Sequence, residues 1–276
     1  EVGREVQALD LVRDHDAVFI GIGLGGANRL GIPGEDLPEV VDALDFIEQI
    51  HTRPLDRVPL GRRVAVLGCG NTAIDAVTQA KRLGADVATI VYRRGPEAMS
   101  AYPFEYELAK TDGAAFLFDT VPIEVVAKDG HVAALKLAKT ALRDGRATIV
   151  PGSEWLEPFD MVLKAVGQEK QVGLLERLFP GLTLDSRGRV KHDPATMRTS
   201  LPTVFVGGDA ASGGREVVNA VAEGKKAARG IHALLAGGAE SGPVQPSRLG
   251  MPDGAVGSGF DHPIRVHELE AALKQG

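Results

Sequence analysis

Cysteine is almost absent from this sequence, since Cys69 is the only one among 276 residues. A single cysteine excludes both an intramolecular disulfide and a cysteine-ligated iron–sulfur cluster within the chain. The seven histidines are scattered without a paired helical spacing, and we expect no metal site. Neither a G-x-S-x-G elbow nor a P-loop is present, which disfavours acyl and phosphoryl transfer. Any chemistry is therefore expected to come from a bound cofactor, and we name no catalytic side chain.

Long apolar runs and an excess of positive charge are missing as well. No segment approaches the ~18 consecutive apolar residues that span a membrane, and no signal peptide is recognisable. The net charge of −6 disfavours nucleic acid or an anionic membrane as a partner. We expect a cytoplasmic globular protein that binds neither, and the start at Glu1 without methionine suggests a piece of a longer protein.

Short apolar runs that alternate with helical spacing predict an α/β fold with a parallel sheet. The expected strands are residues 17–21, 62–67, 86–92, 161–166 and 203–207, and the expected helices are 40–50, 72–83, 104–110 and 217–235. Short β runs at 115–118, 123–128, 132–139 and 147–150 break this alternation, and Asp129-Gly130 predicts a hairpin between two of them. Residues 237–264 are expected to form a flexible linker, and 266–274 a short amphipathic helix.

The sequence holds two glycine loops that match the dinucleotide fingerprint. The first, Gly21-Ile-Gly23-Leu-Gly-Gly26, follows a predicted strand. It leads into a segment that cannot open a helix, because Gly31, Pro33 and Gly34 interrupt it. Without a helix N-terminus there are no free N–H groups to hold a pyrophosphate, so we interpret this segment as a crossover loop.

The second loop joins a buried strand to an amphipathic helix, and it consists of Gly68, Cys69, Gly70, Asn71, Thr72 and Ala73. Gly68 allows the tight turn, Gly70 lets a pyrophosphate approach the backbone, and Ala73 keeps the helix close to the sheet. We predict that Gly68, Gly70, Asn71, Thr72 and Ala73 bind a dinucleotide. The alternative is a βαβ crossover that merely needs small residues. Cys69 is interpreted as a small buried residue, although a helix N-terminus can activate a thiol.

The end of the next predicted strand indicates which dinucleotide binds. NAD sites usually carry an acidic residue there, which accepts the ribose hydroxyls. This chain has Tyr92-Arg93-Arg94 instead, and two guanidinium groups suit a 2′-phosphate through charged, bidentate hydrogen bonds. Arg93 and Arg94 therefore predict NADPH rather than NADH, and the alternative is a solvated basic turn.

A second nucleotide signal follows the last predicted strand, which ends in Gly208 and Asp209 before the helix that begins at Val217. An acidic residue at this place can accept hydrogen bonds from a chain of hydroxyls. The N–H groups at the start of the helix favour a partly anionic ring oxygen. A plain βα connection explains the same residues equally well.

These motifs together resemble a known family. The chain is similar to the small (beta) subunit of NADPH-dependent glutamate synthase and to the related electron-input half of dihydropyrimidine dehydrogenase. The likeness runs from about Asp14 to Leu235, and it rests on Ile32-Pro-Gly-Glu-Asp36, Asp42-Ala-Leu-Asp-Phe46, Gly68-Cys-Gly-Asn-Thr-Ala-Ile-Asp75, Tyr92-Arg-Arg94, and Gly208-Asp209 followed by Val217-Val-x-Ala-Val-x-Glu-Gly-x-x-Ala-Ala.

The resemblance implies a two-dinucleotide flavoprotein, with an NADPH domain at residues 37–165 inserted into an FAD domain. Residues 1–36 and 166–236 would supply part of the FAD domain, and 237–276 would form a linker and tail. In that family Asp209, after Gly208, would bind the flavin ribityl chain. The amides of Val217 and Val218 would lie near the isoalloxazine, and Gly167 would mark the return of the chain to the FAD domain.

Two departures from the family pattern are visible. The family begins with a cysteine-rich iron–sulfur segment and a first FAD βαβ unit. Neither is present, so this chain is expected to start inside the FAD domain. After Arg94, glutamate synthase subunits tend to carry a basic Ser-Arg-Arg-Glu stretch. This chain has Ser100-Ala-Tyr-Pro-Phe-Glu-Tyr-Glu107 there, which leans toward the pyrimidine branch or an unassigned one, and the subfamily stays open.

The resemblance implies an electron-input subunit that passes a hydride from NADPH to FAD and electrons onward to a large catalytic partner. One alternative is a nucleotide-binding module that is redox-silent alone, because the first FAD unit is missing. Another is a docking fragment in which the 237–276 tail recruits a partner.

Overall fold

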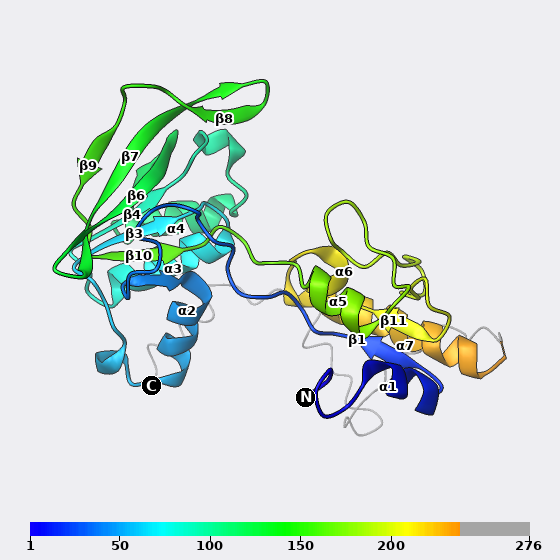
Figure 1. Cartoon of the computed structure of the whole chain (residues 1–276). Helices are drawn as coiled ribbons and strands as arrows, with labels where there is room; N and C mark the ends of the chain where they lie inside the picture. Colours follow the sequence, from blue (N-terminus) through cyan, green and yellow to red (C-terminus); the bar gives the residue numbers. More distant parts are fainter. Residues whose placement is uncertain (238–276) are drawn as a thin grey trace, which may run out of the picture.

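The computed structural model describes residues 1–237, which form two lobes (Figure 1). The large lobe contains residues 37–164, and the small lobe combines residues 1–20 with 172–237; residues 21–36 and 165–171 connect them. Each lobe has its own hydrophobic core. Phe46 and Leu163 belong to the core of the large lobe, whereas Ile20 and Phe205 belong to that of the small lobe.

A five-stranded parallel sheet forms the centre of the large lobe, in the order β2-β10-β3-β4-β5. Its strands are β2 (Val40–Asp42), β3 (Arg63–Leu67), β4 (Val87–Val91), β5 (Ala115–Leu117) and β10 (Met161–Lys164). Parallel sheets are usually covered on both faces, which explains the unbroken apolar runs in the central strands. One face packs against three helices: α2 (Ala43–Thr52), α3 (Asn71–Arg82) and α4 (Pro103–Thr111).

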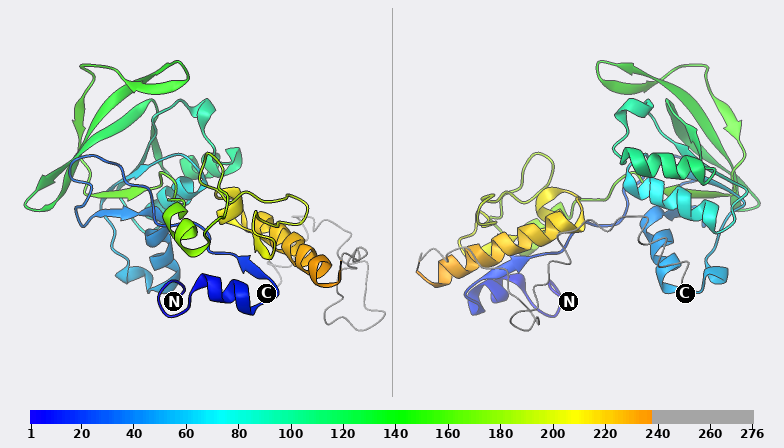
Figure 2. Two further views of the ribbon diagram at one scale, coloured as in Figure 1. Left: turned by 45° about the vertical axis from the view of Figure 1, so that its right-hand side comes forward. Right: turned by 180° about the vertical axis from the view of Figure 1, so that it is seen from behind.

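The other face of this sheet is covered by an antiparallel sheet of β6 (Thr120–Lys128), β7 (His131–Arg143), β8 (Arg146–Ile149) and β9 (Trp155–Glu157). Figure 2 shows the helices and the antiparallel sheet on opposite sides of the lobe. Asp129 and Gly130 join β6 to β7 with positive φ angles of 54° and 83°, as tight hairpin turns require. The predicted hairpin is therefore confirmed.

The small lobe is built on a two-stranded parallel sheet, in which β1 (Val18–Ile20) pairs with β11 (Val204–Val206). Four helices surround this pair: α1 (Ala8–Asp14), α5 (Val172–Leu178), α6 (Asp209–Ser212) and α7 (Val217–Leu235). Gly230 inside α7 allows close packing, because a Cβ there would lie 2.4 Å from the Thr196 carbonyl oxygen.

Two of the sequence predictions are wrong in detail. The predicted helix over 40–50 is a strand followed by a helix, since Val40 and Val41 pair with β10 and α2 begins at Ala43. Residues 115–118 were expected in the antiparallel group, but Ala115–Leu117 joins the parallel sheet as β5. Strands of three residues carry too little periodicity to reveal their partners. The predicted linker at 237–264 lies outside the described residues except for Gly237, and the predicted helix at 266–274 lies wholly outside them.

Candidate functional site

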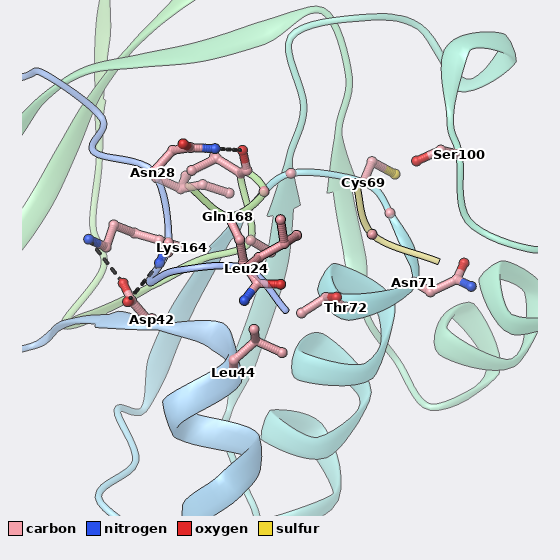
Figure 3. A pocket seen from close by; sticks show the side chains of 18 of the residues that line it. Leu24, Asn28, Asp42, Leu44, Cys69, Asn71, Thr72, Ser100, Lys164 and Gln168 are labelled. Atoms are coloured by element: carbon pink, nitrogen blue, oxygen red, sulfur yellow. Dashed lines mark hydrogen bonds and ion pairs between the residues drawn. The ribbon is translucent and has the colours of Figure 1, made fainter. Parts of the chain in front are cut away.

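A cavity of about 1110 Å³ lies between the two lobes. Figure 3 shows lining residues from the large lobe and from the connecting segments. Its lining includes the carboxyl ends of β3, β4 and β10, represented by Leu67, Val91 and Lys164. Ligands of open α/β sheets bind at this edge. The small lobe contributes Asp209, the segment Gly213–Glu216 and Asn219 of α7 to the same space.

The predicted dinucleotide loop lines the cavity with Gly68, Cys69, Gly70, Asn71 and Thr72. Gly70 is the N-cap of α3, and no side chain within residues 1–237 caps this helix start. The first N–H groups of a helix usually have no intrahelical partner. The Ala73 N–H donates to the Gly70 carbonyl oxygen at 2.9 Å, whereas those of Asn71 and Thr72 have no partner among residues 1–237 and are available to an anionic ligand. Ala73 does not line the cavity, because it is fully buried against the sheet as expected.

Gly68 is required by its backbone conformation and by a close contact. Its φ is +122°, and a Cβ at this position would lie 2.2 Å from the carbonyl oxygen of Ala165. Ala165 immediately follows β10, so the turn and the neighbouring strand approach each other backbone to backbone. Only glycine fits this arrangement without a shift.

The first glycine loop opens no helix, which confirms its interpretation as a crossover loop. It pairs with the returning segment: the Gly25 N–H donates to the Glu169 carbonyl oxygen at 2.8 Å, and the Asn28 N–H donates to that of Gly167 at 2.9 Å. Gly167 lines the cavity at this crossing, and its φ is +84°. The two connecting segments thus support each other between the lobes.

A buried ionic cluster, which sequence reasoning missed, fixes the first connecting segment to the large lobe. Lys164 Nζ lies 3.0 Å from Asp42 Oδ1 and 3.7 Å from Glu35 Oε1. Asp42 Oδ2 in turn accepts the Ala27 N–H at 3.3 Å (Figure 3). A lysine at the end of an apolar strand was the available sequence signal, because buried lysines are rare unless paired.

The Glu35 carboxylate is ionised in this cluster. Burial acts to raise its pKa, but the N–H groups of Leu30 and Gly31, together with Arg29 and Lys164, outweigh burial and hold the pKa below its usual value. The Leu30 N–H donates to Glu35 Oε1 at 2.6 Å and the Gly31 N–H to Oε2 at 2.8 Å. The connecting loop is therefore organised around one buried acid.

We expect Lys164→Met to destabilise the folded chain by about 3 kcal/mol, because it leaves two carboxylates with one cation fewer in a largely buried setting. Urea unfolding measures this change. Arg62→Met is the matched control, since the ion pair of Arg62 with Asp86 is exposed and should contribute less than about 1 kcal/mol. Equal effects of the two variants would contradict the structural role of Lys164.

The two arginines of the predicted 2′-phosphate site lie differently. Arg93 is exposed and lines the cavity, whereas Arg94 does not line it. The Arg93 carbonyl oxygen accepts the Thr140 hydroxyl at 3.0 Å, and that of Arg94 accepts the Asp119 N–H at 3.1 Å. Within the described part of the chain, neither guanidinium forms an ion pair. Hydrogen bonds hold the backbone at both arginines, and Arg93 lines the cavity without an ion pair to any of residues 1–237.

Cys69 is a buried residue of the loop, with 3% of its surface exposed. Burial raises the pKa of the thiol to about 11, so the neutral thiol predominates at physiological pH. We expect a disulfide reagent at pH 8 to label the native chain on the order of a hundredfold more slowly than the unfolded chain. A labelling rate unchanged by unfolding would contradict the assignment of Cys69 as a buried, neutral thiol. Cys69→Ala, which has no thiol, is the control for background reaction of the reagent.

The second predicted nucleotide signal reaches the same cavity through Asp209, which begins α6. Asp209 Oδ1 accepts the Arg215 N–H at 3.0 Å. The Gly208 N–H donates to Glu223 Oε2 at 2.7 Å, a contact that sequence reasoning missed. Gly208 itself does not line the cavity, and its φ is +68°.

The backbone amides of Val217 and Val218 were expected near the flavin ring, and their side chains are exposed. They are 78% and 69% exposed, and neither lines the cavity, although Glu216 just before them does. The structure therefore places the N-terminus of α7 beside the cavity and leaves the two valine side chains at the surface.

The comparison with known proteins adds to this geometry. Residues 4–224 match the model of the pyridine nucleotide-disulphide oxidoreductase family. The chain belongs to this family.

Its curated relatives include subunits with several names. The chain is 38% identical to the glutamate synthase [NADPH] small chain of Escherichia coli, over 84% of this chain and 53% of the relative. It is 35% identical to the NADP(+)-dependent formate dehydrogenase subunit beta of Moorella thermoacetica, over 88% of this chain and 35% of the relative. The similarity to glutamate synthase small chains is confirmed, and the chain spans between about a third and a half of these relatives' length.

Solved structures show the same fold. Mycobacterium tuberculosis FprA in complex with NADPH superposes with a TM-score of 0.66 at 24% identity, covering 86% of this chain and 66% of that one. Thioredoxin reductase of T. acidophilum gives a TM-score of 0.62 at 24% identity, covering 79% and 65%. The predicted α/β fold of the two-dinucleotide flavoprotein type is therefore confirmed.

Residues 1–237 contain neither a membrane-spanning helix nor a cluster of metal ligands. None of the helices there is both long enough and apolar enough to cross a membrane. No group of three or more histidine, cysteine, aspartate or glutamate side chains in that part is arranged to hold a metal ion.

Proposed function

We propose that this chain is the NADPH-binding part, with a portion of the FAD-binding part, of an NADPH-oxidising flavoprotein that feeds electrons to a partner. One observation carries the proposal: a single cavity is lined by the α3 loop and Arg93 from one lobe and by Asp209 from the other. In this proposal residues 37–165 are the NADPH domain. Residues 1–36 and 166–236 belong to the FAD domain.

The large lobe offers what NADPH requires. The uncapped start of α3 suits the pyrophosphate through N–H groups and the helix dipole. Arg93 stands at the end of the following strand, where the adenosine ribose is read in this kind of fold. A guanidinium without a protein counter-ion favours the charged 2′-phosphate over a ribose diol.

The residues of the small lobe fit the flavin end of FAD. Asp209 presents a carboxylate to the cavity beside the N-terminus of α7, as a ribityl chain and a flavin ring require. No helix begins after β1 among the described residues, so this part of the chain offers no helix N-terminus to the adenylate end of FAD. Bound FAD would accept a hydride from NADPH and release the electrons to the partner.

The residues of this chain would bind and orient rather than exchange protons. Arg93 would neutralise the 2′-phosphate, the α3 N-terminus would hold the pyrophosphate, and Asp209 would accept hydrogen bonds from hydroxyls. Hydride transfer between two cofactors needs no acid or base from the protein. The partner proposal rests on relatives whose names describe them as a small chain and a beta subunit.

A second candidate is a module that binds NADPH without redox activity of its own. The small lobe supports this alternative, because its parallel sheet has only two strands within the described residues and an isolated pair is marginal.

Reconstitution with FAD separates the two candidates. The purified chain is incubated with FAD, freed of excess flavin and mixed with NADPH in the absence of oxygen. A retained flavin whose absorbance bleaches on adding NADPH supports the electron-input function. NADPH binding without retained flavin supports the silent module, and failure to bind either cofactor overturns both.

A further inference from the structure

A tyrosine spans the cavity from one lobe to the other. Tyr102 belongs to the segment just before α4, and its phenol donates to Glu216 Oε1 of the small lobe. Among the hydrogen bonds of residues 1–237, this is the only one between the lobes that does not involve the connecting segments. Both residues line the cavity.

The backbone of this segment is attached to the dinucleotide loop. The Tyr102 N–H donates to Asn71 Oδ1 at 3.1 Å, and Asn71 is the first residue of α3. The Ser100 N–H donates to the Cys69 carbonyl oxygen at 3.3 Å. Figure 3 shows Asn71 and Ser100 at the same end of the cavity. A ligand held at this loop therefore touches the residues that hold Tyr102.

The other end of the contact lies at the start of α7. Glu216 is the N-cap residue of this helix, but its side chain does not cap the helix and reaches Tyr102 instead. The residue before it, Arg215, donates its N–H to Asp209. Tyr102 therefore contacts the segment that joins Asp209 to the first turn of α7.

The tyrosine ring is held in place on its own lobe. Phe104 stacks on it, with ring centroids 5.7 Å apart and an interplanar angle of 11°. Stacking of this kind restricts the ring, which favours the contact of the phenol with Glu216 at this exposed position.

We propose that Tyr102 is a positioning residue that couples the nucleotide loop to the flavin-side helix. Nucleotide bound at α3 stabilises the segment at Ser100–Tyr102, and the Tyr102–Glu216 hydrogen bond transmits this order to the first turn of α7. The inference rests on the proposed function, because it assigns the two sites to NADPH and flavin.

Nucleotide binding and the Tyr102–Glu216 contact must affect each other to the same extent if they are coupled. If nucleotide binding favours the Tyr102–Glu216 contact, loss of the contact must weaken nucleotide binding by the same factor. One hydrogen bond of ordinary net strength corresponds to about a fivefold to tenfold change in equilibrium. An effect of this size is therefore expected from a substitution in either lobe.

The test uses NADP⁺, the purified chain and hydrogen exchange. In the unmodified chain, saturating NADP⁺ should slow exchange of the amides of residues 217–221 about fivefold. Tyr102→Phe and Glu216→Ala should each abolish this protection and raise the Kd for NADP⁺ about fivefold. The double variant should be no worse than either single variant, because both remove one interaction.

Two further variants separate coupling from structure. Glu216→Gln retains an oxygen acceptor and should keep the protection. Tyr106→Phe removes a phenol of α4, the helix that follows Tyr102, and this phenol has no hydrogen bond to the small lobe within residues 1–237, so the variant should change nothing. Full protection in Glu216→Ala, or additive losses in the double variant, would overturn the coupling alone. Failure of the unmodified chain to bind NADP⁺ would overturn the proposed function and the coupling with it.

Discussion

Arg93→Ala is expected to weaken NADPH binding about tenfold to a hundredfold, while the affinity for NADH changes less than about twofold. The reason is that a charged hydrogen bond contributes roughly 1.5–3 kcal/mol, and only NADPH carries the phosphate that would receive it. Arg93 faces the cavity, and no ion pair within the described residues occupies its guanidinium.

The two arginines are expected to differ in their effect on NADPH binding. Arg94 does not line the cavity, so Arg94→Ala should have the smaller effect. Arg82→Ala is the matched control, because Arg82 pairs with Asp112 on the surface of the same lobe. Titration calorimetry with both nucleotides measures the preference. An unchanged ratio of NADPH to NADH affinity in Arg93→Ala would remove the role assigned to this residue.

Gly68→Ala is expected to lower the free energy of unfolding by well over 2 kcal/mol and to abolish measurable nucleotide binding. A positive φ costs an L-residue about 1–2 kcal/mol. The new Cβ would in addition lie 2.2 Å from the Ala165 carbonyl oxygen, so the loop or β10 must move. Denaturant unfolding and NADPH titration measure the two consequences.

Substitutions at two other glycines separate the cost of the positive φ from the cost of the close contact. Gly84 also has a positive φ, of +110°, but a Cβ there meets nothing within 4 Å, so Gly84→Ala should cost only the conformational amount. Gly70 has an ordinary φ of −99°, and Gly70→Ala should spare stability while hindering the approach of a pyrophosphate. Equal destabilisation by Gly68→Ala and Gly84→Ala would show that the close contact is unimportant.

The local features of the fold were predictable from the sequence. Helix α7 has the expected bounds because its apolar spacing is long and regular. The dinucleotide loop was predictable because glycines that a strand–turn–helix requires stand at fixed spacing. Strand β2 was missed, because three residues cannot show a period and its pairing with β10 is visible only in space.

The features of the candidate site that were missed all join distant parts of the chain. Lys164 meets Asp42 and Glu35 across the sheet, and Tyr102 meets Glu216 across the two lobes. Such contacts leave no mark on local spacing. Lys164 stands out at the end of an apolar strand, but the sequence does not show which residues it meets. The sequence predicted the loop residues Gly68, Gly70, Asn71 and Thr72 that line the cavity, whereas the contacts between the two halves of the cavity are visible only in the structure.

Calorimetric titration of this chain with NADPH and, separately, with NADH tests the nucleotide site most directly. We expect NADPH to bind at least about tenfold more tightly than NADH, or by about 1.4 kcal/mol, because the α3 loop would bind both nucleotides and Arg93 only the phosphorylated one. Equal affinities would contradict the assignment of Arg93, and absence of binding by either nucleotide would contradict the assignment of the loop itself.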